Sequence, residues 1–116
     1  MNKKAFVTKG YIMITQSVFN VFKSLLAKSH LNDNPALSAS ALLEIERNIE
    51  STIHLDTPLS AIGLDSMTMT WIVVKLEEKY EIDASCVSFF ELHDVNDLIT
   101  QIVALLPQNN SELVQC

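Results

Sequence analysis

Hydrophobic residues recur with the period of an α-helix along four stretches of this chain. The pattern predicts helices over about 14–29, 38–50, 66–80 and 94–106. The first two are separated by "HLNDNPALS", whose Asn, Asp, Asn and Pro residues favour a turn over a helix. Only two glycines and three prolines are present, which suits helices and argues against a many-stranded sandwich. The pattern therefore predicts an all-α protein.

Polar residues at the ends of these stretches supply the expected caps. Ser38 or Ser40 is placed to cap the second helix. Asp94, with Asp97 three residues on, is close to a capping box for the last helix, and Pro107 ends it. The segment "HLDTPLSAIGLD" is predicted to be a connecting loop, which four apolar side chains can hold against a core: Leu55, Leu59, Ile62 and Leu64. The segment "DASCVSFFEL" is predicted to be a short helical piece.

The helix over 66–80 has apolar residues on two faces. One stripe has the spacing of a core-facing surface: Met69, Ile72, Val73, Leu76 and Tyr80. At about 100° per residue, Met67, Trp71 and Val74 fall together on the opposite side. Such a helix is either buried all round or offers one face to a partner. The N-terminal helix is one candidate to cover the second face, and a docking enzyme is the other.

Composition and charge narrow the class of protein. A chain of 116 residues, 48% apolar, is long enough for one modest core. Residues 1–37 carry five lysines against one aspartate, whereas residues 38–106 carry twelve acids against three bases. An acidic body repels nucleic acid and attracts basic protein surfaces. No apolar run reaches the ~18 residues of a membrane span, so we expect no stable membrane insertion. Cys86 and Cys116 are expected to be free thiols in the cytoplasm.

The segment "GLDSM", residues 63–67, places a serine at the start of the 66–80 helix. Gly63 permits a sharp turn just before it. Ser66 has two interpretations: it is a helix cap, or it is a modification site, because a phosphate is electrostatically favoured at a helix N-terminus. A catalytic triad of Ser66 with His54 or His93 and Asp94 is disfavoured, since "GLDSM" is not a G-x-S-x-G elbow. A metal site at Glu91, His93 and Asp94 is weaker still.

Residues 38–106 resemble an acyl carrier protein, a family that includes the peptidyl carriers of nonribosomal peptide synthesis. The resemblance rests on "GLDSM" as the attachment motif, the apolar helix behind it, the acidic pair Glu77 and Glu78, and V-x-D-L in the last helix. It implies a four-helix acyl-carrier-like bundle with a short third helix, here with an extra N-terminal helix. We expect a monomer that carries no catalytic residues of its own.

The resemblance implies that a phosphopantetheinyl transferase attaches 4′-phosphopantetheine from coenzyme A to Ser66. Asp65 would meet the metal or basic groups of the transferase, or else support the first helical turn. The arm would carry acyl or aminoacyl groups as thioesters between loading enzymes and synthases. An unmodified helical interaction module is the alternative.

Two departures from the fatty-acid carriers are visible. Thr68 and Trp71 stand where that group commonly has acids, and only Glu77 and Glu78 match further along. This favours a free-standing carrier of a specialised polyketide, lipopeptide or nonribosomal peptide pathway. We expect Met67, Trp71, Val74, Glu77 and Glu78 to form its partner-docking surface.

The second departure is the N-terminal helix. We divide the chain into an N-terminal extension (1–37), an acyl carrier domain (38–107) and a flexible tail (108–116). The family's first helix is then the one over 38–50; the rival interpretation assigns that place to 14–29. The N-terminal helix is expected to pack on the bundle, with its lysines near the acidic body. Residues 1–12 are expected to be a dispensable extension, because Met13 opens the amphipathic segment.

Overall fold

The computed structural model describes residues 2–106, except for the side chains of residues 2–12 and 90. Its elements in chain order are α1 (Asn2–Asp33), α2 (Ala39–Thr52), α3 (Leu59–Ile62), α4 (Ser66–Tyr80), the 3₁₀ turn η1 (Phe89–Glu91) and α5 (Val95–Leu105). Residues 2–106 contain no β-strand, so the predicted all-α fold is confirmed. The short third helix of the bundle is η1, and α1 is the extra N-terminal helix. None of the described helices is long and apolar enough to cross a bilayer.

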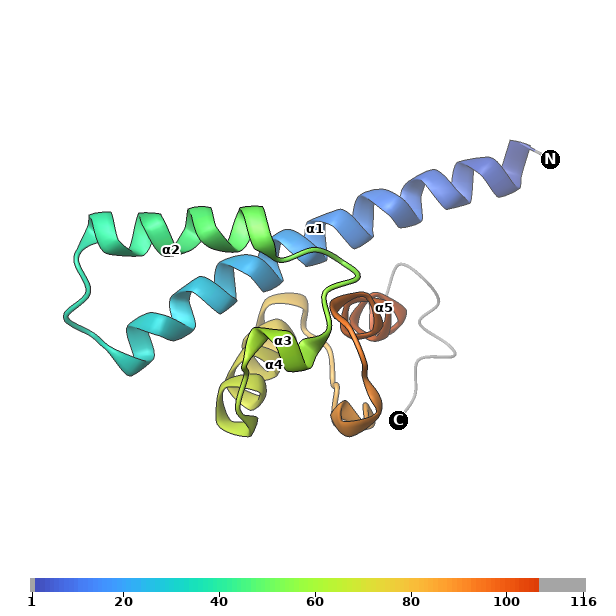
Figure 1. The fold of residues 1–116 in the computed structure, drawn as a ribbon. Helices are drawn as coiled ribbons and strands as arrows, with labels where there is room; N and C mark the ends of the chain where they lie inside the picture. The colour runs from blue at the N-terminus through green and yellow to red at the C-terminus, as the bar shows by residue number, and fades with distance from the viewer. Residues whose placement is uncertain (1, 107–116) are drawn as a thin grey trace.

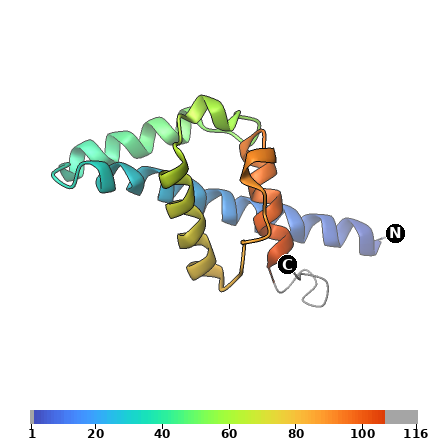
Figure 2. The ribbon, with the colours of Figure 1, turned by 90° about the horizontal axis from the view of Figure 1, so that it is seen from below.

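The helix α1 is longer and more central than predicted. It lies between α2 on one side and α4 and α5 on the other, and its N-terminal turns extend past the other helices (Figures 1 and 2). The prediction began this helix at residue 14, yet it starts at Asn2. The single Gly10 does not break it, because one glycine in a helix interior costs only about 1 kcal/mol.

The hydrophobic core is built mainly from α1, α4 and α5. On α1, Val18 and Phe22 are at most 1% exposed. Most of the other fully buried side chains come from α4 and α5: Ile72, Leu76, Val95, Leu98, Ile99, Ile102 and Val103. By contrast, α2 and its C-cap contribute only Ile49 and Ile53. The expected packing of the N-terminal helix on the bundle is therefore confirmed, and α2 is the outer helix.

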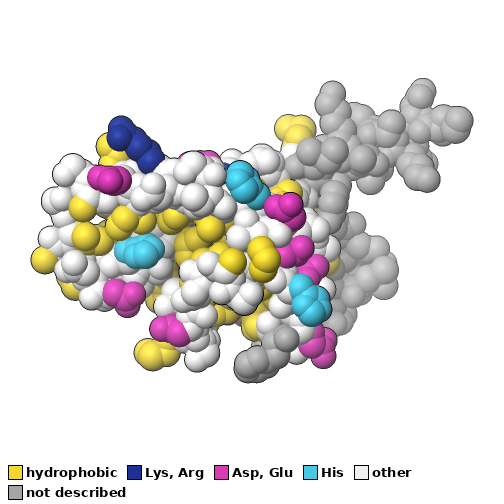
Figure 3. Space-filling model, in the orientation of Figure 1, with side chains coloured by type: hydrophobic (Ala, Val, Ile, Leu, Met, Phe, Trp, Pro, Cys, Tyr) yellow, Lys and Arg dark blue, Asp and Glu magenta, His cyan; other side chains and the backbone are white. Residues whose placement is uncertain are grey.

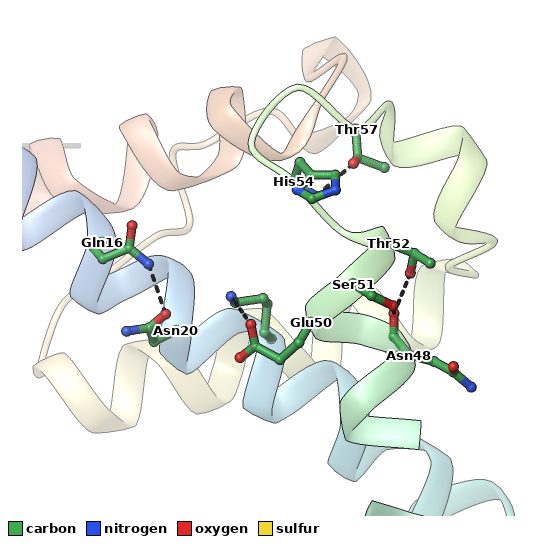
Figure 4. Close-up of polar contacts among 9 residues, drawn as sticks. Gln16, Asn20, Asn48, Glu50, Ser51, Thr52, His54 and Thr57 are labelled. Carbon is green, nitrogen blue, oxygen red and sulfur yellow. Dashed lines mark hydrogen bonds and ion pairs between the residues drawn. The ribbon is translucent and has the colours of Figure 1, made fainter. Parts of the chain in front are cut away.

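The contact between α1 and α2 includes one ion pair. Lys23 Nζ lies 2.8 Å from a carboxylate oxygen of Glu50, which is labelled in Figure 4, and 4.4 Å from the centroid of the Phe19 ring. Lys23 is 8% exposed, whereas the Glu50 side chain is 66% exposed. A mostly buried ammonium needs such a partner, because an unpaired charge there would be strongly destabilising. The expected approach of an N-terminal lysine to the acidic body is confirmed at Lys23.

The predicted caps are present. The Ser38 hydroxyl accepts a hydrogen bond from the Ala41 N–H at 3.1 Å and begins α2. At α5, Asp94 accepts from the Asp97 N–H, while the Asp97 carboxylate accepts from the Asp94 N–H, which completes the capping box. Each cap satisfies donors that a helix N-terminus otherwise leaves unpaired.

The segment between α2 and α4 is more ordered than the predicted loop. It contains the one-turn helix α3, and backbone hydrogen bonds join it to the start of α5. The Leu59 N–H donates to the His93 carbonyl at 2.9 Å, and the Asn96 N–H donates to the Leu55 carbonyl at 2.7 Å. As predicted, four apolar side chains of this segment pack against the core: Leu55, Leu59, Ile62 and Leu64. These contacts hold the chain in position just before Ser66.

The prediction of a free thiol at Cys86 is wrong, since this cysteine is disulfide-bonded in the structure. Cys116, Pro107 and the predicted tail over 108–116 lie outside the described residues.

Candidate modification site at Ser66

Gly63, whose backbone has a left-handed conformation, turns the chain between α3 and the start of α4. Gly63 caps the C-terminus of α3 with φ of 77°, a conformation in which side chains are strongly disfavoured. Space is not the constraint, because a Cβ built at this position meets no atom within 4 Å. The requirement for glycine, which the sequence suggested, therefore comes from the backbone alone.

Asp65, and not Ser66, caps α4. The Asp65 Oδ1 atom accepts a hydrogen bond from the Thr68 N–H at 2.7 Å. That bond, supported by the Thr68 hydroxyl, lowers the pKa of Asp65 below its ordinary value of 3.8, so the carboxylate is charged at neutral pH. The interpretation of Ser66 as the cap is thus wrong. Ser66 is the first residue of α4, and it is exposed.

An apolar groove of about 360 Å³ opens directly beside Ser66. Residues of α3, of the first turns of α4 and of the η1 region line it, among them Leu64, Met69, Phe89 and Leu92. The sequence predicted that Leu64 holds the connecting loop against the core, but it gave no indication that Phe89 or Leu92 would lie at the site. The available signal was "FFEL" itself, because an apolar segment too short to form its own core must pack on a neighbour.

The second apolar face of α4 is largely open. Met67 is 82% exposed and Val74 is 40% exposed, so α1 does not cover these positions. Trp71 differs from them, because its half-buried ring packs against the core, and Lys75 Nζ lies 5.9 Å from its centroid. Met67 is consequently the most accessible apolar side chain next to Ser66.

The two glutamates of the expected docking surface have different environments. Glu77 Oε2 accepts a hydrogen bond from the Ala84 N–H at 2.7 Å and so holds the segment after α4 against the helix. Glu78 is exposed and lies 3.5 Å from Lys75 Nζ. Of the pair, Glu78 is the one whose carboxylate faces solvent.

The alternative catalytic and metal-binding groupings are not assembled at Ser66. The residues that line its groove include no histidine within the described part of the chain. Asp94 is engaged in the capping box, and the His93 N–H donates to Asp97 at 2.8 Å. No group of three or more His, Cys, Asp or Glu side chains among the described residues is arranged to hold a metal ion.

Comparison with known proteins adds one finding. A family model described as a phosphopantetheine attachment site matches residues 37–102. The match spans α2 to most of α5, includes Ser66 and excludes α1. No curated protein and no solved structure matches the chain.

Proposed function

We propose, from the finding that this chain belongs to the phosphopantetheine attachment site family, that it carries its 4′-phosphopantetheine on Ser66 and conveys acyl or aminoacyl intermediates between enzymes. The observation that carries this proposal is the exposed serine at the first position of α4, beside an apolar groove. The bound arm supplies a thiol that forms thioesters, so the protein itself acts as a carrier and not as an enzyme.

The residues at the start of α4 fit a phosphodiester on Ser66. In the transfer, the Ser66 oxygen forms a bond to the phosphorus of the pantetheine phosphate, the phosphoanhydride bond of coenzyme A breaks, adenosine 3′,5′-bisphosphate leaves, and the hydroxyl proton passes to the transferase. The positive end of the α4 dipole then favours the remaining negative charge. Asp65 is also charged there, and we propose that it meets the basic groups or the metal ion of the transferase.

The groove fits the apolar parts of an arm attached at Ser66. Its volume of about 360 Å³ falls within the range of small-molecule sites, and its walls are mainly aliphatic and aromatic. Leu64, Met69, Phe89 and Leu92 are among its apolar lining residues. Chains that enter the groove would be shielded from water close to their point of attachment.

The open face of α4 supports a docking role. Met67, Val74 and Glu78 are exposed on the helix that begins at Ser66. An apolar anchor next to the attachment point suits partners of a specialised polyketide, lipopeptide or nonribosomal peptide pathway. Trp71 would contribute the edge of its ring, whereas Glu77 serves chiefly the fold.

We further propose that residues 38–107 form the carrier domain, in which α2 is the family's first helix, and that residues 1–37 are an extension specific to this protein. The match over residues 37–102 supports this division. Nevertheless α1 contributes to the core, since it supplies the buried side chains of Val18 and Phe22. We propose that this carrier acts as a monomer in the cytoplasm, where coenzyme A and the transferase would be available to it.

Intact mass after incubation with coenzyme A and a broad-specificity phosphopantetheinyl transferase tests the proposal. The wild-type mass should rise by one phosphopantetheine, and Ser66→Ala should abolish the gain. Ser60→Ala is the matched control, because Ser60 lines the same groove but is the second residue of the one-turn helix α3 and does not begin a helix. An unchanged wild-type mass with several transferases would contradict attachment and favour the unmodified interaction module.

A further inference from the structure

A second hollow lies on the other side of the attachment site. It is a crevice of about 320 Å³ between the C-terminal half of α1, the end of α2, α3 and the first turn of α4. In Figure 3 the recess below α2 has apolar side chains inside it, with acidic and histidine side chains at its edge. It shares Leu64 and Asp65 with the groove, but its remaining walls are different.

The crevice exists because of α1. That helix contributes Leu26, Ser29, His30 and Asp33 to its lining. Since α1 lies outside the residues that match the family model, the crevice is a feature of this protein and not of the matched region alone. Any ligand that it selects would therefore distinguish this carrier.

The floor and the rim of the crevice differ chemically. On the floor, Leu26, Ile49 and Ile53 are each at most 9% exposed. The buried Ser29 hydroxyl donates to the Leu26 carbonyl at 2.6 Å, so it is already satisfied. The rim, by contrast, is polar and more accessible, with His30 and Asp33 exposed.

With histidine counted as neutral, the charges at the rim have one sign. Asp33 and Asp65 are the carboxylates, and the described residues that line the crevice include no lysine or arginine. A ligand carboxylate would be repelled here, whereas an ammonium would be attracted. The crevice thus fits a ligand with a small apolar body and a positively charged amine.

The crevice begins close to the attachment point of an arm on Ser66. Asp65, the immediate neighbour of Ser66, lines both the groove and the crevice, and Thr68 in the first turn of α4 lines the crevice as well. A substituent on the exposed Ser66 hydroxyl therefore begins one residue away from the lining of the crevice.

We propose that the crevice binds the aminoacyl group of an α-aminoacyl thioester carried on Ser66. The side chain of the cargo lies on Leu26, Ile49 and Ile53, and its α-ammonium lies at the Asp33 edge. This inference rests on the proposed function and deepens it, because it states that the cargo shielded by the fold is an aminoacyl group and not an acyl group without an amine.

The test compares two cargoes that differ only in the amine. The full-length protein is loaded through the transferase from leucyl-coenzyme A or from 4-methylpentanoyl-coenzyme A. The rate of thioester cleavage by hydroxylamine is divided by the rate for the same thioester on free pantetheine, which cancels the intrinsic reactivity of each thioester. Leucyl cargo should be protected more strongly than 4-methylpentanoyl cargo.

Two variants locate the effect. Asp33→Asn should reduce the protection of leucyl cargo by about two- to five-fold, the range expected for one exposed charge pair, and should leave 4-methylpentanoyl unchanged. Glu44→Gln is the matched control, because Glu44 is exposed on α2 and does not line the crevice. Ala61→Leu, which narrows the crevice without altering the groove lining, should also reduce protection of leucyl cargo only.

Equal protection of the two cargoes on the wild-type protein would overturn the inference. So would an effect of Asp33→Asn no larger than that of Glu44→Gln. A protein whose mass shows no arm refutes the proposed function instead. In that case the crevice is tested separately, by titrating the ¹⁵N-labelled protein with leucyl-pantetheine amide. Shifts of the His30, Asp33 and Thr52 amides support the crevice, and their absence rejects it.

Discussion

Replacing Phe22 by alanine tests whether α1 is part of the folding unit or an appendage to it. Phe22 is 0% exposed and is among the largest fully buried side chains. A buried phenylalanine removes about 200 Å² from water, worth ~5 kcal/mol at about 25 cal/mol per Å². Phe→Ala substitutions in cores lose about 3–5 kcal/mol, because the remaining cavity collapses only in part. Most domains have a total stability of only about 5–15 kcal/mol.

Urea denaturation followed by circular dichroism and by Trp71 fluorescence measures this loss. The expected result is a decrease of about 3–5 kcal/mol in the free energy of unfolding, with both signals changing together. Leu43→Ala is the control, since Leu43 is 47% exposed on α2 and should cost less than about 1 kcal/mol. If Phe22→Ala lost less than ~1 kcal/mol, the core would not depend on α1 and the central position of this helix would be wrong.

Three further predictions concern the attachment segment. Gly63→Ala should lower the free energy of unfolding by about 1–2 kcal/mol through backbone strain alone, and Gly63→Asn should lower it less. Equal urea midpoints for the wild type and Gly63→Ala would contradict this expectation. The lowered pKa of Asp65 means that its charge stabilises the fold above about pH 4 and that this contribution is lost as the pH falls through the folded-state value. The difference in melting temperature between the wild type and Asp65→Asn should therefore be present at pH 6 and shrink towards pH 2, and a difference independent of pH would reject the charged cap. Met67→Ser should change the free energy of unfolding by less than about 0.5 kcal/mol, yet it should slow loading by the cognate enzyme. Trp71→Ala should slow loading and also destabilise the fold, because its ring packs against the core. Unchanged loading of Met67→Ser would remove Met67 from the docking surface.

The helices nearest the site could be predicted closely because their signals are local. The apolar stripe over 66–80 predicted α4, which spans Ser66–Tyr80. The capping box of Asp94 and Asp97 and the cap at Ser38 follow from hydrogen bonds between residues three apart. Such interactions depend on a few consecutive residues, so a single sequence contains all the information they need.

The N-cap of α4 could not be predicted from neighbouring residues alone. Asp65 and Ser66 are adjacent, and both residue types are good caps. The turn at Gly63 sets which of them occupies the position before the first helical residue, and the contacts between the 53–59 segment and α5 place that turn. That choice leaves the Ser66 hydroxyl free for modification.

Periodicity by itself determined which residues of this protein form amphipathic helices, and the "GLDSM" motif indicated where an arm would be attached. Only the tertiary structure decided that α1 and not α2 fills the centre of the core, because both helices carry apolar stripes of similar kind. It also decided that Phe89 and Leu92 line the same groove as Ser66, and that α1 adds a second crevice nearby. The physical reason is that distant segments compete for the same partner surface, and this competition decides which apolar stripe is buried. The helical period of the sequence contains no information about that competition.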